Sequence, residues 1–86
     1  MRNVVFEAVA FAHTQEWLAE DKKTLQRIMR MLQECQRTPF EGIGKPEPLK
    51  GNYKGYWSRR ITDGHRLIYR ADDASVVVCS LKGHYE

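Results

Sequence analysis

Residues 56–81, YWSRRITDGHRLIYRADDASVVVCSL, contain three runs rich in β-branched and aromatic side chains, separated by two short polar turns. We expect strands over 56–62, 65–70 and 75–81, joined by turns at Asp63-Gly64 and Asp72-Asp73. Connections this short join neighbouring strands that run in opposite directions. The second half of the chain is therefore predicted to fold as an antiparallel β-meander.

The first turn also predicts which side chains share a face of the sheet. In a two-residue turn at Asp63-Gly64, Thr62 faces His65 and Ile61 faces Arg66. One face would then carry Trp57, Arg59, Ile61, Arg66, Ile68 and Arg70, and the other Tyr56, Ser58, Arg60, His65, Leu67 and Tyr69. Neither face is wholly apolar, so one of them is expected to hold buried or cleft-lining polar groups.

The chain before this sheet is predicted to be mainly helical. A short apolar run over 2–6 is expected to form a first strand, and residues 7–20 contain no glycine or proline that would break a helix. A stripe from Phe6 to Trp17 recurs at helical spacing and is expected to face the core. If Trp17 were exposed instead, it would be a natural anchor for a partner.

A second helix is predicted to follow Asp21, whose side chain can cap its first turn. Its apolar positions recur at three- and four-residue spacing and are Leu25, Ile28, Met29, Leu32 and Cys35. The helix is expected to end near Thr38, because Pro39 disfavours helical geometry in the residue before it. Glycines and prolines then predict a loop as far as Gly55, with Glu47 inside it.

Bulk composition predicts a single globular domain. The chain has 86 residues, of which 42% are hydrophobic and 29% charged. No basic-then-apolar leader follows Met1, and no apolar run approaches the roughly 18 residues that span a bilayer, so we expect a cytoplasmic protein without a membrane partner. Disulfides are rare in that compartment, which predicts that Cys35 and Cys79 are free, buried thiols.

Positive charge is concentrated between Arg37 and Arg70. This segment holds eight lysines and arginines against three acidic residues, whereas the rest of the chain holds six against eight. Aromatic side chains are interleaved with the cations, at Phe40, Tyr53, Tyr56, Trp57 and Tyr69. Cations that alternate with flat rings suit a polyanion that carries bases, so the segment predicts a nucleic-acid-binding surface.

The reactive groups of the sequence form a set that needs no metal. The three histidines lack metal-ligand spacing, and phosphate-loop, dinucleotide and serine-elbow motifs are missing. What remains is Glu47, Arg66, and His84 with Tyr85 near the end of the chain. A carboxylate, a guanidinium and an imidazole are the groups required to cleave RNA through attack of its own 2′-hydroxyl. Each is equally well explained as a solvated loop, surface or tail residue, and spacing alone does not decide.

Five ordered strings, TPFEG, GKPEPLK, GYWSRRIT, HRLIY and the C-terminal HY, resemble the YoeB-type toxins of the RelE/ParE superfamily. The resemblance implies one domain over 1–86 with an α+β fold, in which two N-terminal helices pack on a twisted antiparallel β-sheet (the RelE-like microbial ribonuclease fold). It also implies the toxin of a type II toxin-antitoxin system. Such a toxin cuts messenger RNA in the ribosomal A site without a cofactor and is inhibited by a YefM-like antitoxin.

The resemblance assigns roles residue by residue. Glu47 is the expected general base, and Arg66 is expected to stabilise the phosphate. His84 is the expected general acid, with Tyr85 as its neighbouring aromatic residue. The basic positions expected to hold RNA are Lys45, Lys50, Arg59 and Arg60. The chain departs from the pattern at its last residue, because Glu86 follows His-Tyr.

Two functions remain open from the sequence. The first is the ribosome-dependent nuclease, and the second is a non-catalytic nucleic-acid-binding or regulatory module of the same superfold that acts with an antitoxin, since the ParE branch lacks this nuclease chemistry. Antitoxin segments are typically acidic and partly disordered, and one is expected to cover Glu47, Arg66 and His84. A second copy of the chain, and operator DNA reached through the antitoxin complex, are further candidate partners.

Overall fold

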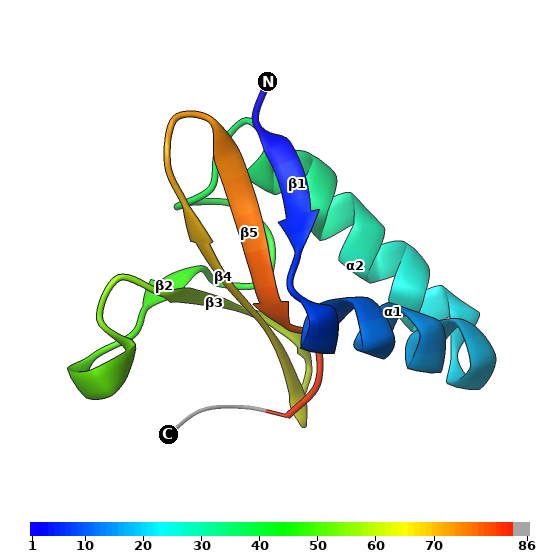
Figure 1. Cartoon of the computed structure of the whole chain (residues 1–86). Helices are drawn as coiled ribbons and strands as arrows, with labels where there is room; N and C mark the ends of the chain where they lie inside the picture. The colour runs from blue at the N-terminus through cyan, green and yellow to red at the C-terminus, as the bar shows by residue number, and fades with distance from the viewer. Residues whose placement is uncertain (84–86) are drawn as a thin grey trace.

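Two helices and one five-stranded sheet make up the fold (Figure 1). The structure, a computed structural model, describes residues 1–83. In chain order the elements are β1 (Asn3–Phe6), α1 (Ala8–Glu20), α2 (Lys22–Cys35), β2 (Glu47–Pro48), a 3₁₀ turn (Gly51–Tyr53), β3 (Trp57–Thr62), β4 (His65–Ala71) and β5 (Ser75–Ser80). The predicted α+β class with two N-terminal helices is confirmed. No helix in this part of the chain is long and apolar enough to cross a membrane.

The strands lie in the order β1-β5-β4-β3-β2 across the sheet. β2, β3, β4 and β5 pair antiparallel, as the meander predicts, but β1 pairs parallel to β5 with Val4 opposite Val76. The sheet is therefore mixed rather than wholly antiparallel, because the chain leaves β1 through both helices and returns beside it only with β5. β2 is a second difference, since the sequence predicts only a loop there.

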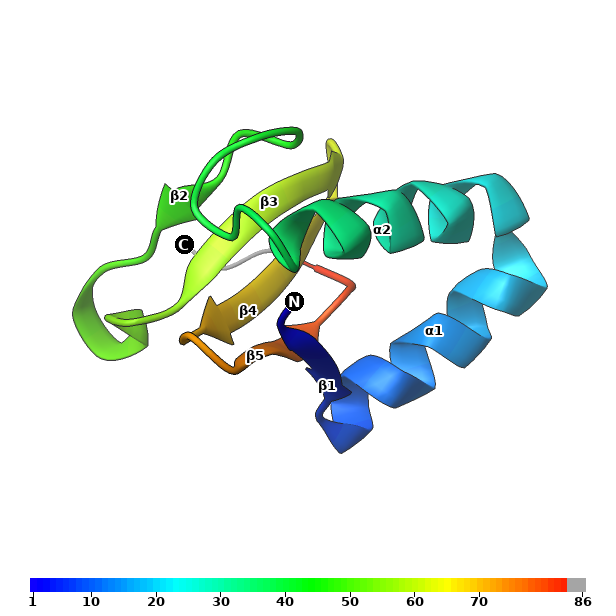
Figure 2. The ribbon, with the colours of Figure 1, turned by 90° about the horizontal axis from the view of Figure 1, so that it is seen from above.

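Both helices cover the same face of the sheet, as the view from above shows (Figure 2). The Asp21 carboxylate accepts a hydrogen bond from the Thr24 amide and so caps α2 as predicted. Trp17 is 6% exposed, which confirms its place in the core. The apolar stripe of α2 differs from the prediction at one position, because Met31 is buried while Met29 is 39% exposed. The helices and the sheet share one core, made of Ala10, Trp17, Ile28, Met31, Leu32, Cys35, Ile61, Leu67, Tyr69, Val76, Val78 and Leu81.

A β-bulge at Ile61 sets which side chains of β4 face the helices. Thr62 pairs with His65, but the next pair is Arg60 with Arg66, so Ile61 is an extra residue in β3. The prediction that Ile61 faces Arg66 is therefore wrong. Directly paired residues share a face, so Arg66 lies on the same face as Arg60, away from the helices, while Ile61 stays buried in the core. Every β4 residue after the bulge changes face relative to the prediction.

The two cysteines are free, as predicted. Cys35 is buried in the core, and Cys79 is half-buried in β5. Burial raises the pKa of each thiol to about 11. Both thiols therefore remain protonated near neutral pH, where they are poor nucleophiles.

Candidate functional site

A small hollow of about 90 Å³ lies on the face of the sheet that the two helices leave open. It is lined by Gly44, Lys45, Glu47, Ser58, Arg60 and Arg66. A hollow of this size has room for a small charged group such as a phosphate. Four residues predicted from the sequence thus come together, the carboxylate of Glu47 and the cations Lys45, Arg60 and Arg66.

Two residues with left-handed backbone bring the loop to this hollow. Gly44 has a φ of 82° and Lys45 a φ of 52°. This region suits glycine but is uncommon for a residue with a Cβ atom, and such strain is concentrated at functional sites. The Arg60 amide donates to the Gly44 carbonyl at 2.6 Å, and Glu47 then pairs with Ser58 at the edge of the sheet. The turn thereby delivers Lys45 and Glu47 to the strand that carries Arg60.

One end of the Arg66 guanidinium is fixed by the turn between β3 and β4. Its Nη1 donates to the carbonyl oxygens of Thr62 (2.7 Å), His65 (3.1 Å) and Asp63 (3.2 Å). Its Nε and Nη2 atoms make no hydrogen bond with any of residues 1–83. An arginine held in this way offers an anion a set of N–H donors whose position is already fixed.

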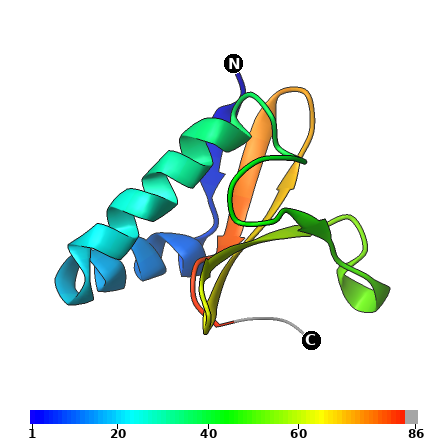
Figure 3. The same ribbon diagram turned by 180° about the vertical axis from the view of Figure 1, so that it is seen from behind.

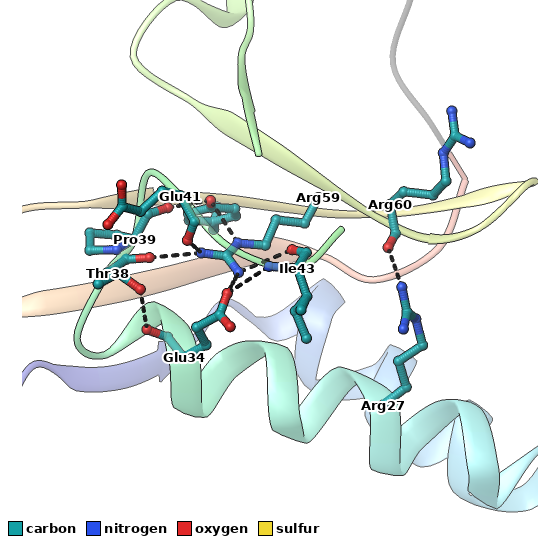
Figure 4. A network of polar contacts seen from close by, with 9 residues as sticks. Arg27, Glu34, Thr38, Pro39, Glu41, Ile43, Arg59 and Arg60 are labelled. Atoms are coloured by element: carbon teal, nitrogen blue, oxygen red, sulfur yellow. Dashed lines mark hydrogen bonds and ion pairs between the residues drawn. The ribbon is translucent and has the colours of Figure 1, made fainter. Parts of the chain in front are cut away.

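Arg59 does not line the hollow, so its predicted contact with RNA is wrong. Its side chain is 0% exposed, because it pairs with Leu67 on the face that the helices cover. Figure 4 shows the Arg59 guanidinium beside α2, whereas the side chain of Arg60 extends away from that helix. The acceptors of the Arg59 guanidinium are Glu34 Oε1 (2.5 Å) and the carbonyl oxygens of Thr38 (2.8 Å), Glu41 (2.9 Å) and Ile43 (3.1 Å).

The Arg59 network fixes the connection that follows α2. Seen from behind, this connection curves back toward β3 (Figure 3), and three of its carbonyl groups between residues 38 and 43 accept hydrogen bonds from Arg59. Arg59 Nε also donates to the Tyr69 hydroxyl at 3.2 Å, which itself donates to the Pro39 carbonyl at 2.5 Å. Burial raises the pKa of Tyr69 to about 12, so the hydroxyl keeps its proton. Arg59 therefore supports the hollow indirectly, through the loop that leads into it.

Glu34 completes this network from α2. The hydrogen bond from Arg59 is the largest cause that lowers the pKa of Glu34, and a further bond from the Ile43 amide at 2.8 Å acts in the same direction. The carboxylate is therefore ionised at neutral pH. A salt bridge from the helical layer thus holds the loop from which Lys45 and Glu47 reach the hollow.

Besides Arg59, one further predicted residue of the described chain, Lys50, is not among those that line the hollow. Lys50 is exposed in the connection after β2. His84 and Tyr85 lie outside the described residues. The structure does describe Gly83, which precedes them, and its carbonyl accepts a hydrogen bond from the Arg66 amide at 2.8 Å. The described end of the chain therefore lies beside a residue of the hollow.

Sequence reasoning did not identify Gly44 and Ser58 as residues of the hollow. A signal for Ser58 is present, because it alternates with Arg60 along a predicted strand and therefore shares its face. Gly44 carries only the general signal of a loop glycine. Residues 1–83 contain no group of three or more His, Cys, Asp or Glu side chains arranged to hold a metal ion.

The fold and the hollow define a small α+β protein that presents one carboxylate among three cations on the helix-free face of its sheet. A family profile described as the YoeB-like toxin of bacterial type II toxin-antitoxin system matches residues 6–85. The chain therefore belongs to the YoeB-like toxins of type II toxin-antitoxin systems.

Similar proteins agree with this assignment over nearly the whole chain. Toxin YoeB of Mycobacterium bovis is 54% identical over 85 residues, which are 99% of this chain and 100% of that protein. The structure of the YoeB dimer from Staphylococcus aureus matches with a TM-score of 0.91 and 42% identity, and covers 98% of each chain. The YoeB-YefM complex from the same organism matches with a TM-score of 0.88 and 41% identity over 99% of each chain.

Proposed function

We propose that this toxin is a ribosome-dependent endoribonuclease that cuts messenger RNA in the A site without a metal. The 2′-hydroxyl of the substrate attacks the adjacent phosphate, which leaves a 2′,3′-cyclic phosphate and a 5′-hydroxyl. The observation that carries the proposal is the hollow, where one carboxylate and three cations surround a space of about 90 Å³. This is the set of groups that an attack on a phosphodiester requires.

Each group has a role that follows from its chemistry and place. Glu47 removes the proton from the 2′-hydroxyl as the oxygen attacks phosphorus. Arg66 binds the phosphate through Nε and Nη2 and neutralises the charge that develops in the transition state, assisted by Arg60 and Lys45. His84 gives a proton to the departing 5′-oxygen, and Tyr85 stacks on a neighbouring base.

The hollow accommodates a phosphate, and the rest of an RNA substrate would lie outside it. Binding energy for the rest of the substrate must then come from surfaces outside it. Lys50 is proposed to contact the RNA backbone there, which its exposure beyond β2 supports. A requirement for the ribosome fits this arrangement, because a programmed ribosome presents the message in a fixed orientation. Reactions whose partners are already oriented gain much of their rate from that positioning.

Inhibition is proposed to come from a YefM-like antitoxin. The match to the YoeB-YefM complex from S. aureus supports an antitoxin partner, and the match to the YoeB dimer supports a second copy of the chain as a further partner. An acidic antitoxin segment that covers Glu47 and Arg66 would exclude the phosphate by occupying the same cations. Operator DNA would be reached through that complex.

The test is cleavage of a short messenger RNA by purified toxin freed of antitoxin, with and without programmed ribosomes. The Arg66→Met variant is expected to lose at least about 100-fold in kcat, the effect of removing one fixed donor to a transition-state oxyanion. Arg70→Met is the matched control, because Arg70 is an exposed arginine of the same strand and does not line the hollow. It should cut within about threefold of the parent.

The chemistry is checked in the same assay through the RNA ends and two further variants. The upstream ends of RNA cut by the parent should carry a 2′,3′-cyclic phosphate. Glu47→Gln and His84→Ala should fold normally and make no cuts. Folded variants that cut at the parental rate contradict the assigned roles. If the folded parent makes no cuts in either arm, the toxin is instead a non-catalytic binding module.

A further inference from the structure

The three residues that lead into His84 are held by a complete set of backbone hydrogen bonds. Leu81–Gly83 follow β5, outside its ladder, yet all six of their backbone N–H and C=O groups are hydrogen-bonded. The Leu81 amide donates to His13 Nδ1 at 3.0 Å, and the Gly83 amide donates to His65 Nδ1 at 2.9 Å. Trp17 Nε1 donates to the Leu81 carbonyl at 3.0 Å. A terminal segment is usually poorly ordered unless it is tied down, and here specific side chains tie it down.

These hydrogen bonds require one tautomer of each histidine ring. A backbone amide always carries its hydrogen, so the Nδ1 atoms of His13 and His65 must be acceptors. An imidazole nitrogen accepts only when it is unprotonated, so both rings are neutral and carry their proton on Nε2. Leucine could fill the same space, but it would leave the two amides without partners.

The two histidines belong to one cluster with the rest of the anchor. The Trp17 and His65 rings meet edge to face, with centroids 5.0 Å apart and an interplanar angle of 87°. Lys82 Nζ lies 4.9 Å from the centroid of the Trp17 ring and pairs with Glu16 at 3.1 Å and Glu20 at 2.8 Å. The segment is therefore held from α1 on one side and from β4 on the other.

We infer that His13 and His65 are positioning residues for cleavage, because their Nδ1 acceptors fix Leu81–Gly83 and so fix where the chain enters His84. This inference rests on the proposed nuclease function. His65 directly precedes Arg66, whose amide donates to the Gly83 carbonyl at 2.8 Å. Arg66, proposed to bind phosphate, is thus hydrogen-bonded to Gly83, which directly precedes the proposed general acid His84. A shift of about 1 Å at such a point can cost a factor of 100 in rate.

The experiment compares acceptor and non-acceptor substitutions at each histidine. In His13→Asn and His65→Asn the amide oxygen can take the place of Nδ1 as an acceptor, whereas His13→Leu and His65→Leu remove the acceptor and keep the bulk. The leucine variants are expected to lose at least about tenfold in kcat in the ribosome assay, with KM changed less than about threefold. The asparagine variants are expected to stay within about threefold of the parent in both quantities.

Amide hydrogen exchange of the purified toxin, followed by NMR, supplies a readout that does not depend on cleavage. Exchange at Gly83 should be at least about tenfold faster in His65→Leu than in His65→Asn, and exchange at Leu81 should respond in the same way to the His13 pair. Core amides such as that of Val78 should be unchanged, which excludes global unfolding as the cause.

Each outcome decides a separate statement. Loss of both protection and kcat in the leucine variants, with rescue by asparagine, supports the inference. Lost protection with parental kcat overturns the positioning role, and unchanged protection overturns the anchor itself. If the parent makes no cuts at all, the proposed function fails and the positioning role with it, while exchange still shows whether the histidines hold the segment.

Discussion

Replacing Arg59 by methionine tests the claim that this arginine is structural rather than RNA-binding. Methionine keeps much of the buried length but removes the guanidinium. The substitution removes the hydrogen bond to the Tyr69 hydroxyl, the salt bridge to Glu34 and three hydrogen bonds to loop carbonyl groups.

The magnitude depends on how far water replaces the lost partners. A net hydrogen bond contributes about 1 kcal/mol, and breaking a buried ion pair by removing one partner costs roughly 3–5 kcal/mol. The Glu34 side chain is 31% exposed, and the loop residues that supply the carbonyl acceptors are also exposed, so water compensates part of the loss. Removing the buried guanidinium also removes its desolvation cost, which further reduces the loss of stability. We therefore expect Arg59→Met to lower the free energy of unfolding by about 3 kcal/mol, against a total of roughly 5–15 kcal/mol for a domain.

Urea unfolding followed by far-UV circular dichroism measures this directly. With a slope of about 1 kcal/mol per M for a small domain, the midpoint should fall by roughly 3 M. Arg60→Met is the matched control, because Arg60 is the exposed neighbour in the same strand. It should change stability by less than about 0.5 kcal/mol but lower cleavage. If Arg59→Met were as stable as Arg60→Met, the assignment of Arg59 to the interior framework would be refuted.

Three further perturbations follow from the fold. Ile61→Ala should lower the free energy of unfolding by about 3 kcal/mol in a urea titration, because it opens a cavity in the core. In the ribosome assay the folded variant should cut almost as fast as the parent, since Arg66 lies on the other face of the sheet. Gly42→Ala should cost at least about 2 kcal/mol, because φ is 121° and the new Cβ would overlap a carboxylate oxygen of Glu34 in α2. Gly55→Ala, at a φ of 98° with open space around it, should show only the backbone strain. The pKa of His13 is lowered in the folded protein, and burial is the largest cause. Just below about pH 6.5, His13 therefore binds a proton in the unfolded chain but not in the folded chain. The contribution of neutral His13 to the free energy of unfolding should accordingly be fully present above that pH and be lost as the pH drops through the folded pKa. Urea midpoints at pH 7.5 and 5.5 should therefore differ less in His13→Asn than in the parent.

The elements that local pattern determines could be predicted from the sequence. Helical spacing predicted α1 and α2, and the Asp63-Gly64 turn predicted the β3-β4 hairpin. The bulge at Ile61 could not be predicted in this way, because it depends on packing against helices that are distant in the chain. The two residues of β2 are likewise defined only by their pairing with β3. Local pattern therefore gave the elements, while long-range packing decided their exact register.

The same distinction explains the candidate site. Charge counting located a basic segment, but it treated Arg59 and Arg60 alike, although alternation in a strand sends neighbours to opposite faces. The burial of Arg59, at 0% exposure, shows which of the two faces is the interior one. Glu47 and Arg66 were candidates because of their chemistry, the family resemblance assigned their roles, and the structure places both at one hollow. The resemblance therefore supplied the proposed roles, and the fold brings Glu47 and Arg66 to one place.

The arrangement of layers gives a reason why the hollow forms where it does. The helices occupy one face of the sheet, so the charged groups that we propose to bind an RNA phosphate are left to the other face. Their positions are nevertheless set from the helical side, because Glu34 of α2 holds Arg59 and its loop, while His13 of α1 holds Leu81. The bulge at Ile61 completes the arrangement, since it keeps an apolar residue in the core and still places Arg66 beside Arg60. A substitution in the helical layer can therefore alter cleavage without touching the substrate, and the change should appear in kcat before it appears in KM.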